Sequence, residues 1–143
     1  MRVLLDTNIF ISYLLAAKPA SPIYQVVRAG LRGEFVILLP GSLLTEFTRR
    51  VRQKPYLSAR ITEPELQEFI SLLSTLAETI PPITQAIPRV TRDPKDDYLL
   101  AYALVGQANY LVTGDDDLLD LNQADTVTIV SPREFLSVLN RVE

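Results

Sequence analysis

The first ten residues, MRVLLDTNIF, place a carboxylate in the middle of an apolar stretch. Residues 3–5 form a continuous apolar run, which is typical of a short strand buried on both faces. Asp6, Thr7 and Asn8 follow, and the sequence becomes apolar again at Ile9. Asp6 can be interpreted as the N-cap of a helix or as a functional acid at the end of a buried strand. The rest of the chain has to distinguish these interpretations.

Short apolar runs alternate with helical patterns along the chain. Further strands are predicted at residues 35–39, 110–112 and 127–130, and the first helix at residues 7–17. Residues 80–88 are interrupted by prolines and are predicted to form an extended connection. The alternation predicts an α/β fold with a mostly parallel sheet and helices on both faces. The length predicts a single domain over residues 1–143.

Capping patterns mark the starts of several predicted helices. Ser42 is the expected N-cap of the helix after the second strand. Thr62 with Glu65, and Ser131 with Glu134, match the capping box, in which the two side chains bind each other's backbone N–H groups. These patterns support the predicted helix boundaries.

The composition excludes several classes of chemistry. The chain has no Cys and no His, so disulfides, thiolate metal sites, a Cys nucleophile and a Ser-His-Asp triad are excluded. The net charge is -3, so the chain as a whole is not a basic nucleic-acid binder, although its charges are segregated. Because an apolar run follows Met1-Arg2 directly and no segment is long enough to span a membrane, a cytoplasmic protein is expected.

Acidic side chains occur where the predicted fold brings strand ends together. Asp6 follows the first strand, residues 115–117 (DDD) follow the third, and Glu46 lies early in the helix after the second. Asp96 and Asp97 lie in the first turn of the helix that leads into the third strand. Ligands of open α/β sheets bind at the carboxyl ends of the strands, so these groups are expected to converge. Clustered carboxylates repel one another, and Mg²⁺ or Mn²⁺ would relieve that repulsion.

Each acid also has a simpler local explanation. Glu46 alone would be a solvated helix residue. Asp93 is the expected N-cap of its helix, and Asp96 and Asp97 would then favour the helix dipole. The run at residues 115–117 could be a turn with a cap; within it, Asp115 and Asp117 are the expected inward pair and Asp116 the solvated member. Tyr98 and Tyr102 are expected to be packing residues.

Four stretches together resemble PIN domains: LLDTNIFISYLL, the Glu after the second strand, RDPKDDYLLAYA and YLVTGDDDLL. Within that family the sequence is most similar to the bacterial and archaeal toxins of toxin-antitoxin systems, relatives of the VapC toxins. The resemblance implies a three-layer α/β/α sandwich around a mostly parallel sheet of four to five short strands. It also implies Mg²⁺- or Mn²⁺-dependent cleavage of RNA phosphodiester bonds.

The resemblance assigns roles to residues of this chain. The implied catalytic acids are Asp6, Glu46, Asp97 and Asp115. Relatives often carry the third acid one residue earlier, so Asp96 is an alternative to Asp97, and Asp117 adds to the implied metal ligands. The implied supporting polar residues are Thr7, Asn8 and Thr113.

The resemblance also implies partners. The basic residues expected to hold the RNA backbone are Arg49, Arg50, Arg52, Lys54, Arg92 and Lys95; those at residues 49–54 could equally be a solvated helix end. An antitoxin protein is the implied regulatory partner. Relatives form dimers, to which the apolar helix over residues 66–76 could contribute, although the protein core explains its apolar stripe equally well.

Two alternative functions compete with the ribonuclease. One is a PIN-like module that binds RNA or a partner protein without catalysis; the complete set of acids argues against it. The other is a Mg²⁺-dependent phosphatase with Asp6 as a covalent nucleophile. Such enzymes usually place a second Asp two residues later, where this chain has Asn8.

Overall fold

The computed structural model of the chain describes residues 1–15 and 18–142. Its elements in chain order are β1 (Arg2–Leu5), α1 (Thr7–Leu14), α2 (Pro22–Leu31), β2 (Val36–Pro40), α3 (Gly41–Gln53), α4 (Pro55–Ser58), α5 (Glu63–Leu76), β3 (Glu78–Ile80), α6 (Pro94–Val105), β4 (Tyr110–Val112), α7 (Asp116–Leu119), β5 (Gln123–Ala124), β6 (Val127–Val130) and α8 (Pro132–Val142).

One sheet of six strands, in the order β3-β2-β1-β4-β6-β5, forms the centre of the molecule. Neighbouring strands are parallel except for β5 and β6. β1 lies inside the sheet, where Leu4 is opposite Leu38 of β2 and Leu111 of β4. All three leucines are buried, as expected for a strand covered on both faces. The predicted α/β fold with a mostly parallel sheet is confirmed.

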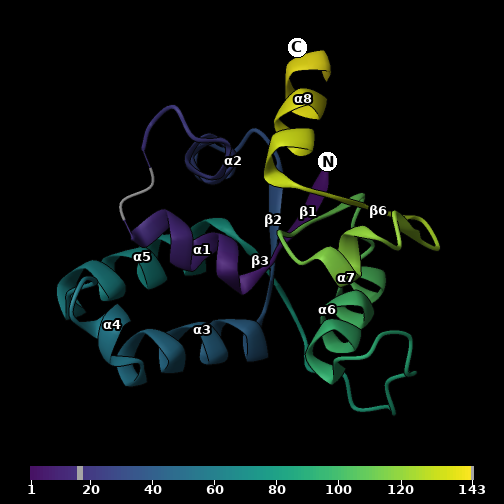
Figure 1. Cartoon of the computed structure of the whole chain (residues 1–143), viewed down its shortest axis with the longest axis horizontal. Coiled ribbons are helices and arrows are strands. Elements are labelled where there is room, and N and C mark those ends of the chain that lie inside the picture. The colour runs from purple at the N-terminus through teal and green to yellow at the C-terminus, as the bar shows by residue number, and fades with distance from the viewer. Residues whose placement is uncertain (16–17, 143) are drawn as a thin grey trace.

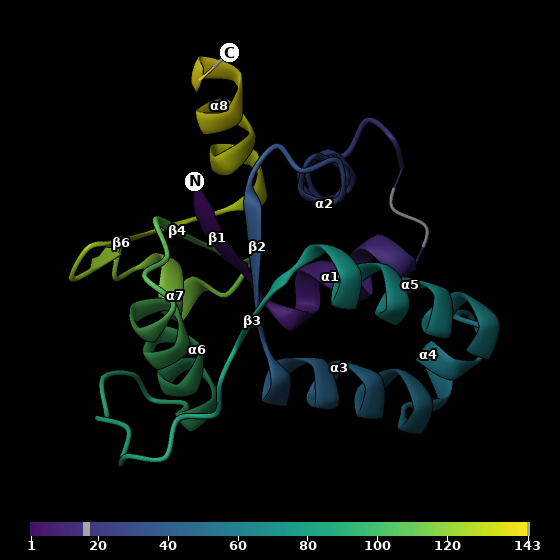
Figure 2. The same cartoon turned by 180° about the vertical axis from the view of Figure 1, so that it is seen from behind.

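Helices cover both faces of the sheet. In Figures 1 and 2, α1, α2, α3 and α5 lie to one side of β1 and β2, and α6 and α7 lie to the other. α8 packs against α2 at the end of the molecule where β1 begins. The opposite end, where β1 and β2 finish, is flanked by the start of α3 and by α6. Residues at these strand ends therefore lie between the two groups of helices.

The number of strands differs from the predicted four to five. Both unpredicted strands are very short and lie at the edges of the sheet. β3 contains Glu78 and Thr79, which are exposed, so it has no apolar run that would reveal a strand. β5 has two residues and pairs antiparallel with β6. Edge strands of this kind form because a neighbouring strand offers backbone hydrogen-bonding groups, not because of their own hydrophobic pattern.

Two predicted helix boundaries also differ. The first helix ends at Leu14, and the predicted end at residue 17 lies outside the described residues. Ser42 is not the N-cap of α3. Because β2 extends to Pro40 and leads directly into α3 at Gly41, Pro40 takes the N-cap position, without a side-chain capping bond. In the described part of the chain, no helix is both long and apolar enough to cross a membrane.

The other predicted caps are confirmed. Thr62 and Glu65 form the capping box at the start of α5, with both reciprocal hydrogen bonds present. Ser131 and Glu134 make the same pair of bonds at the start of α8. Asp93 accepts a hydrogen bond from the backbone of α6 and caps it. These caps fix where α5, α6 and α8 begin.

Three phenylalanines hold α1, α3 and α5 together. Phe10 of α1 lies 6.1 Å from Phe47 of α3 and 5.7 Å from Phe69 of α5, measured between ring centroids, with edge-to-face geometry. Phe47 and Phe69 pack against each other at 5.9 Å. Such aromatic contacts combine a large buried area with a preferred orientation. Because Phe47 follows Glu46 in the sequence, this cluster also fixes the position of Glu46 relative to β1.

Candidate metal centre

Asp6 lies where β1 ends and α1 begins. Its backbone N–H donates to Val112 O at 3.0 Å, which continues the pairing of β1 with β4. Its side chain is the N-cap of α1 and accepts from the backbone N–H of Asn8. Asp6 therefore fulfils both sequence interpretations, because it caps a helix and also presents a carboxylate at the carboxyl edge of the sheet.

Thr113 connects two of the acids. Its hydroxyl donates to Asp6 Oδ2 at 2.8 Å and accepts from the backbone N–H of Asp115 at 3.0 Å. Thr113 is fully buried, so it holds these partners without competition from solvent. Asp115 in turn accepts from the backbone N–H of Asp117 at 2.9 Å and caps α7. The ends of β1 and β4 are thus joined by a continuous hydrogen-bonded chain.

Asp96 of α6 completes a compact group of carboxylates. One carboxylate oxygen from each of Asp96, Asp115 and Asp117 lies within 4.8 Å of the others. Burial raises the pKa of Asp96 to about 7, and a hydrogen bond with Asp115 and the negative charge of that carboxylate add to the effect. Burial also raises the pKa of Asp6, although its hydrogen bonds with Thr113 and Asn8 oppose the shift. The folded chain thus concentrates negative charge here, and within the group Arg92 pairs with the carboxylate of Asp117.

Asp97 has different surroundings from Asp96. Its carboxylate accepts hydrogen bonds from Val90 N, Thr91 N and Thr91 Oγ1 and forms an ion pair with Arg89 at 3.0 Å. Burial disfavours the charged form, but these bonds outweigh it and lower the pKa of Asp97. The geometry therefore assigns Asp97 to holding residues 89–91 against α6. Both oxygens of Asp97 are already engaged, whereas Asp96, the alternative acid of the third motif, lines the groove.

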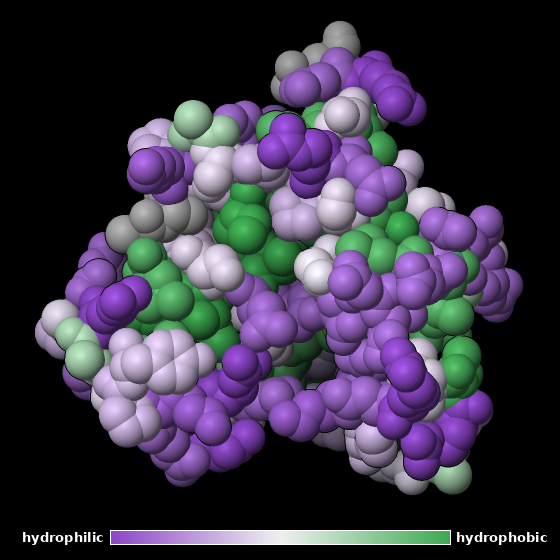
Figure 3. Space-filling model, in the orientation of Figure 1, coloured by the Kyte–Doolittle hydropathy of each residue, from purple (hydrophilic) through white to green (hydrophobic). Residues whose placement is uncertain are grey.

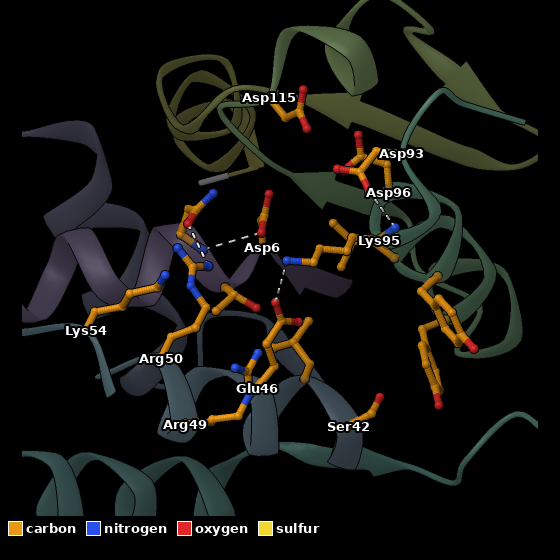
Figure 4. A pocket seen from close by; sticks show the side chains of 16 residues that line it. Asp6, Ser42, Glu46, Arg49, Arg50, Lys54, Asp93, Lys95, Asp96 and Asp115 are labelled. Carbon is orange, nitrogen blue, oxygen red and sulfur yellow. Dashed lines mark hydrogen bonds and ion pairs between the residues drawn. The ribbon is translucent and has the colours of Figure 1, made fainter. Parts of the chain in front are cut away.

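Glu46 extends from α3 toward the same region, across an open groove of about 750 Å³ (Figure 4). The groove is lined by Asp6, Thr7, Asn8, Ser42, Leu43, Glu46, Arg49, Arg50, Lys54, Asp93, Lys95, Asp96, Tyr98, Leu99, Tyr102 and Asp115. The structure thus brings together an acid from each of the four motifs. Figure 3 shows strongly hydrophilic residues around the hollow between the α3 side and the α6 side of the molecule.

Basic residues lie beside the acids in the groove. Arg49, Arg50 and Lys54 line it from α3 and its C-cap, and Lys95 lines it from α6. Arg50 Nη1 donates to Asn8 Oδ1 at 3.0 Å, which holds its guanidinium close to the end of β1. Acids at the strand ends with a basic wall beside them form a site that can bind a cation and a polyanion together.

A family comparison agrees with this arrangement. The family model described as PIN domain matches residues 2–117. The chain belongs to the PIN domain family. The matched region contains all five acids that line the groove, and PIN domains are a nuclease family. No curated protein matches the chain.

Two of the expected RNA-binding residues lie outside the groove of this PIN domain. Arg52 forms an ion pair with Glu63 of α5 at 2.6 Å. Arg92 pairs with Asp117 at 2.6 Å and does not line the groove, although it lies beside the carboxylate group. Their positive charges are therefore partly neutralised by acids of the same chain, unlike that of Arg50.

The donor set fits a hard divalent cation. The groove-lining side chains that can ligate are carboxylates and amide or hydroxyl oxygens, which suit Mg²⁺ and Mn²⁺, and the chain has no His or Cys. Burial is the main cause of the raised pKa values of Asp96 and Asp6, and repulsion from neighbouring acids adds to it. A cation between Asp96, Asp115 and Asp117 would remove that cost. The structure thus supports a metal site in this PIN domain on chemistry as well as on family membership.

The groove also contains residues that sequence reasoning missed. Tyr98 lines it with 53% of its surface exposed, so the prediction that Tyr98 is a packing residue is wrong. The same prediction is confirmed for Tyr102, which is buried and accepts a hydrogen bond from Ile83 N. The helical spacing of Lys95, Tyr98 and Tyr102 could have indicated one shared face of α6.

Proposed function

We propose that this PIN domain is a metal-dependent endoribonuclease and that it acts as the toxin of a toxin-antitoxin pair. The convergence of Asp6, Glu46, Asp96 and Asp115 in one groove carries the first part of the proposal. The four-motif resemblance to the toxins of such systems supports the second part. An antitoxin protein would be the regulatory partner.

The chain supplies binding and orientation for the cleavage. Asp6, Asp96 and Asp115 would hold a principal Mg²⁺ or Mn²⁺ ion, and Glu46 would complete its ligands or hold a second ion. When bound, the ion supplies a nucleophilic water at neutral pH and neutralises charge on the phosphate. The Thr113 hydroxyl keeps Asp6 and Asp115 in position, because it donates to the Asp6 carboxylate and accepts from the backbone N–H of Asp115.

The basic wall would orient the RNA. Arg49, Arg50 and Lys54 would contact backbone phosphates, so that one phosphodiester lies over the carboxylates. Water would attack the phosphorus atom in line with the departing sugar oxygen, which leaves a phosphate on one fragment and a hydroxyl on the other. Because the chain has no His, no imidazole can serve as general base, and a carboxylate of the groove would accept the proton of the attacking water.

A cleavage assay on total cellular RNA tests this proposal. The wild-type protein with Mn²⁺ or Mg²⁺ is expected to cut RNA, and EDTA is expected to stop it. The Asp6→Asn variant should keep the same circular dichroism spectrum and lose at least about a hundredfold in rate. Sequencing of the cut ends would identify the cleavage site. Wild-type cleavage rates in clean Asp6→Asn preparations would contradict the assignment, and RNA binding without cleavage would identify a non-catalytic module.

The toxin role needs a separate test. Expression of the wild-type chain in a bacterial host is expected to arrest growth, and expression of Asp6→Asn at the same level is not. Equal growth with both chains would contradict the toxin role while leaving the ribonuclease assignment intact.

A further inference from the structure

Lys95 spans the groove from one wall to the other. It lies in the first turn of α6, its side chain is 74% exposed, and its Nζ lies 3.9 Å from Glu46 Oε1 of α3 (Figure 4). Glu46 is the only acid of α3, and Lys95 is the only basic residue of α6. The pair therefore connects the two walls by opposite charges.

The partner of Lys95 distinguishes it from the other bases of the groove. Arg50 donates to the neutral amide of Asn8, and Arg49 donates to the amide of Gln53 at 3.4 Å. Among the groove-lining bases of residues 1–15 and 18–142, Lys95 is the one paired with a candidate metal ligand.

An ammonium group and a divalent cation compete for the same carboxylate. Exposed ion pairs of this length contribute little to the stability of a fold. A divalent cation held by several carboxylates binds far more strongly, so it displaces the ammonium. The displaced Lys95 remains beside the groove on a flexible side chain, with its positive charge free for an anion.

We propose that Lys95 exchanges partners in the reaction proposed above. It pairs with Glu46 when no divalent cation is bound, it is displaced when the cation binds, and it then contacts a backbone phosphate of the RNA. The inference rests on the proposed ribonuclease function. It makes Lys95 a residue that weakens cation binding and strengthens RNA binding, two effects of opposite sign.

Substitution of Lys95 by methionine tests the exchange. Lys95→Met removes the charge and keeps a long side chain at an exposed position. Calorimetry with Mn²⁺ is expected to show about three- to tenfold tighter binding than in the wild type, because no ammonium competes for Glu46. Cleavage of an RNA oligonucleotide by the same variant is expected to fall about tenfold in kcat/KM, and the dependence of RNA affinity on salt should decrease by about one counterion.

Two further variants control the experiment. Arg141→Met removes one positive charge from the last turn of α8, whose C-terminal end lies away from α3 and α6 (Figure 1), and should leave Mn²⁺ affinity and the salt dependence unchanged. Lys95→Arg keeps the charge and should restore the wild-type salt dependence. Unchanged Mn²⁺ affinity or an unchanged salt dependence in Lys95→Met would overturn the exchange. If the wild type bound no Mn²⁺ or cut no RNA, the proposed function itself would fail, so the two failures are distinguishable.

Discussion

Asp96 and Asp97 are neighbours in the first turn of α6, yet their carboxylates belong to different parts of the structure. Asp96 shares the groove with Asp115, and a hydrogen bond with that residue helps to raise its pKa. The carboxylate of Asp97 accepts four hydrogen bonds, which come from Arg89, Val90 and Thr91. One acid therefore remains available to a cation, and the other holds the long connection before α6 in place.

Substitution of each acid by asparagine should separate these roles. Asp96→Asn is expected to lose at least about tenfold in Mn²⁺ affinity, because one carboxylate ligand becomes neutral. Asp97→Asn is expected to lower the melting temperature and to make residues 81–93 more sensitive to proteolysis, because an amide cannot replace a charged acceptor for four hydrogen bonds. Calorimetry and limited proteolysis on both variants measure the two effects. The opposite result, with Mn²⁺ binding lost only in Asp97→Asn, would reverse the assignment.

The stability of the metal-free protein should fall as pH rises from the ordinary pKa of Asp96 to its raised pKa in the folded state. The carboxyl group of Asp96 has an ordinary pKa of 3.8 and a folded-state pKa of about 7. Below pH 3.8 the Asp96 carboxyl is protonated in both the folded and the unfolded chain. Between the two pKa values it is ionised in the unfolded chain but still protonated in the folded chain, so the free energy of unfolding decreases as the pH rises. We expect the melting temperature in EDTA to decrease from pH 5 to pH 8, and to decrease less in Asp96→Asn. Mn²⁺ affinity should rise over the same interval, because the cation binds the ionised carboxylate. Identical pH profiles of stability for the two proteins would contradict this explanation.

Thr113→Val should damage both the fold and the site. The substitution conserves shape but removes the hydroxyl that donates to Asp6 and accepts from the backbone N–H of Asp115. Leaving buried polar groups without partners costs about 1–3 kcal/mol, so the denaturant midpoint should fall. Mn²⁺ affinity should fall as well, because Asp6 is no longer held. Thr113→Ser keeps the hydroxyl and is the matched control; a Val variant as stable and as competent in Mn²⁺ binding as the Ser variant would show that the bridge is dispensable.

The strand ends that carry the site were predictable from the sequence, whereas the choice between adjacent acids was not. A doubly buried strand followed by Asp6 has few structural solutions, and parallel topology then places Asp115 beside it. Asp96 and Asp97 both fit the first turn of a helix equally well. Which one faces the groove depends on how α6 is rotated by the packing of Leu100 and Ala103, and that rotation is a tertiary property.

The basic residues show a similar division. Their clustering at residues 49–54 was visible in the sequence, but their partners were not. Arg52 forms an ion pair with Glu63, which follows α4 in the chain. The positive charge of Arg52 is therefore directed away from the groove. Arg50 reaches Asn8, 42 positions earlier in the chain. Ion pairs between separate helices depend on helix packing, which local charge patterns do not encode.

The position of β1 inside the sheet also affects when a nascent chain can assemble the groove. β1 is made first, but its neighbour β4 begins at Tyr110, and Thr113 joins Asp6 across 107 positions of sequence. At a synthesis rate of about 5–20 residues per second, roughly 5 to 20 seconds separate the translation of Asp6 from that of Asp115. A chain released early by the ribosome, before β4, would carry Asp6 and Glu46 without the acids that complete the groove. Translation itself therefore delays assembly of the groove until the last motif has been made.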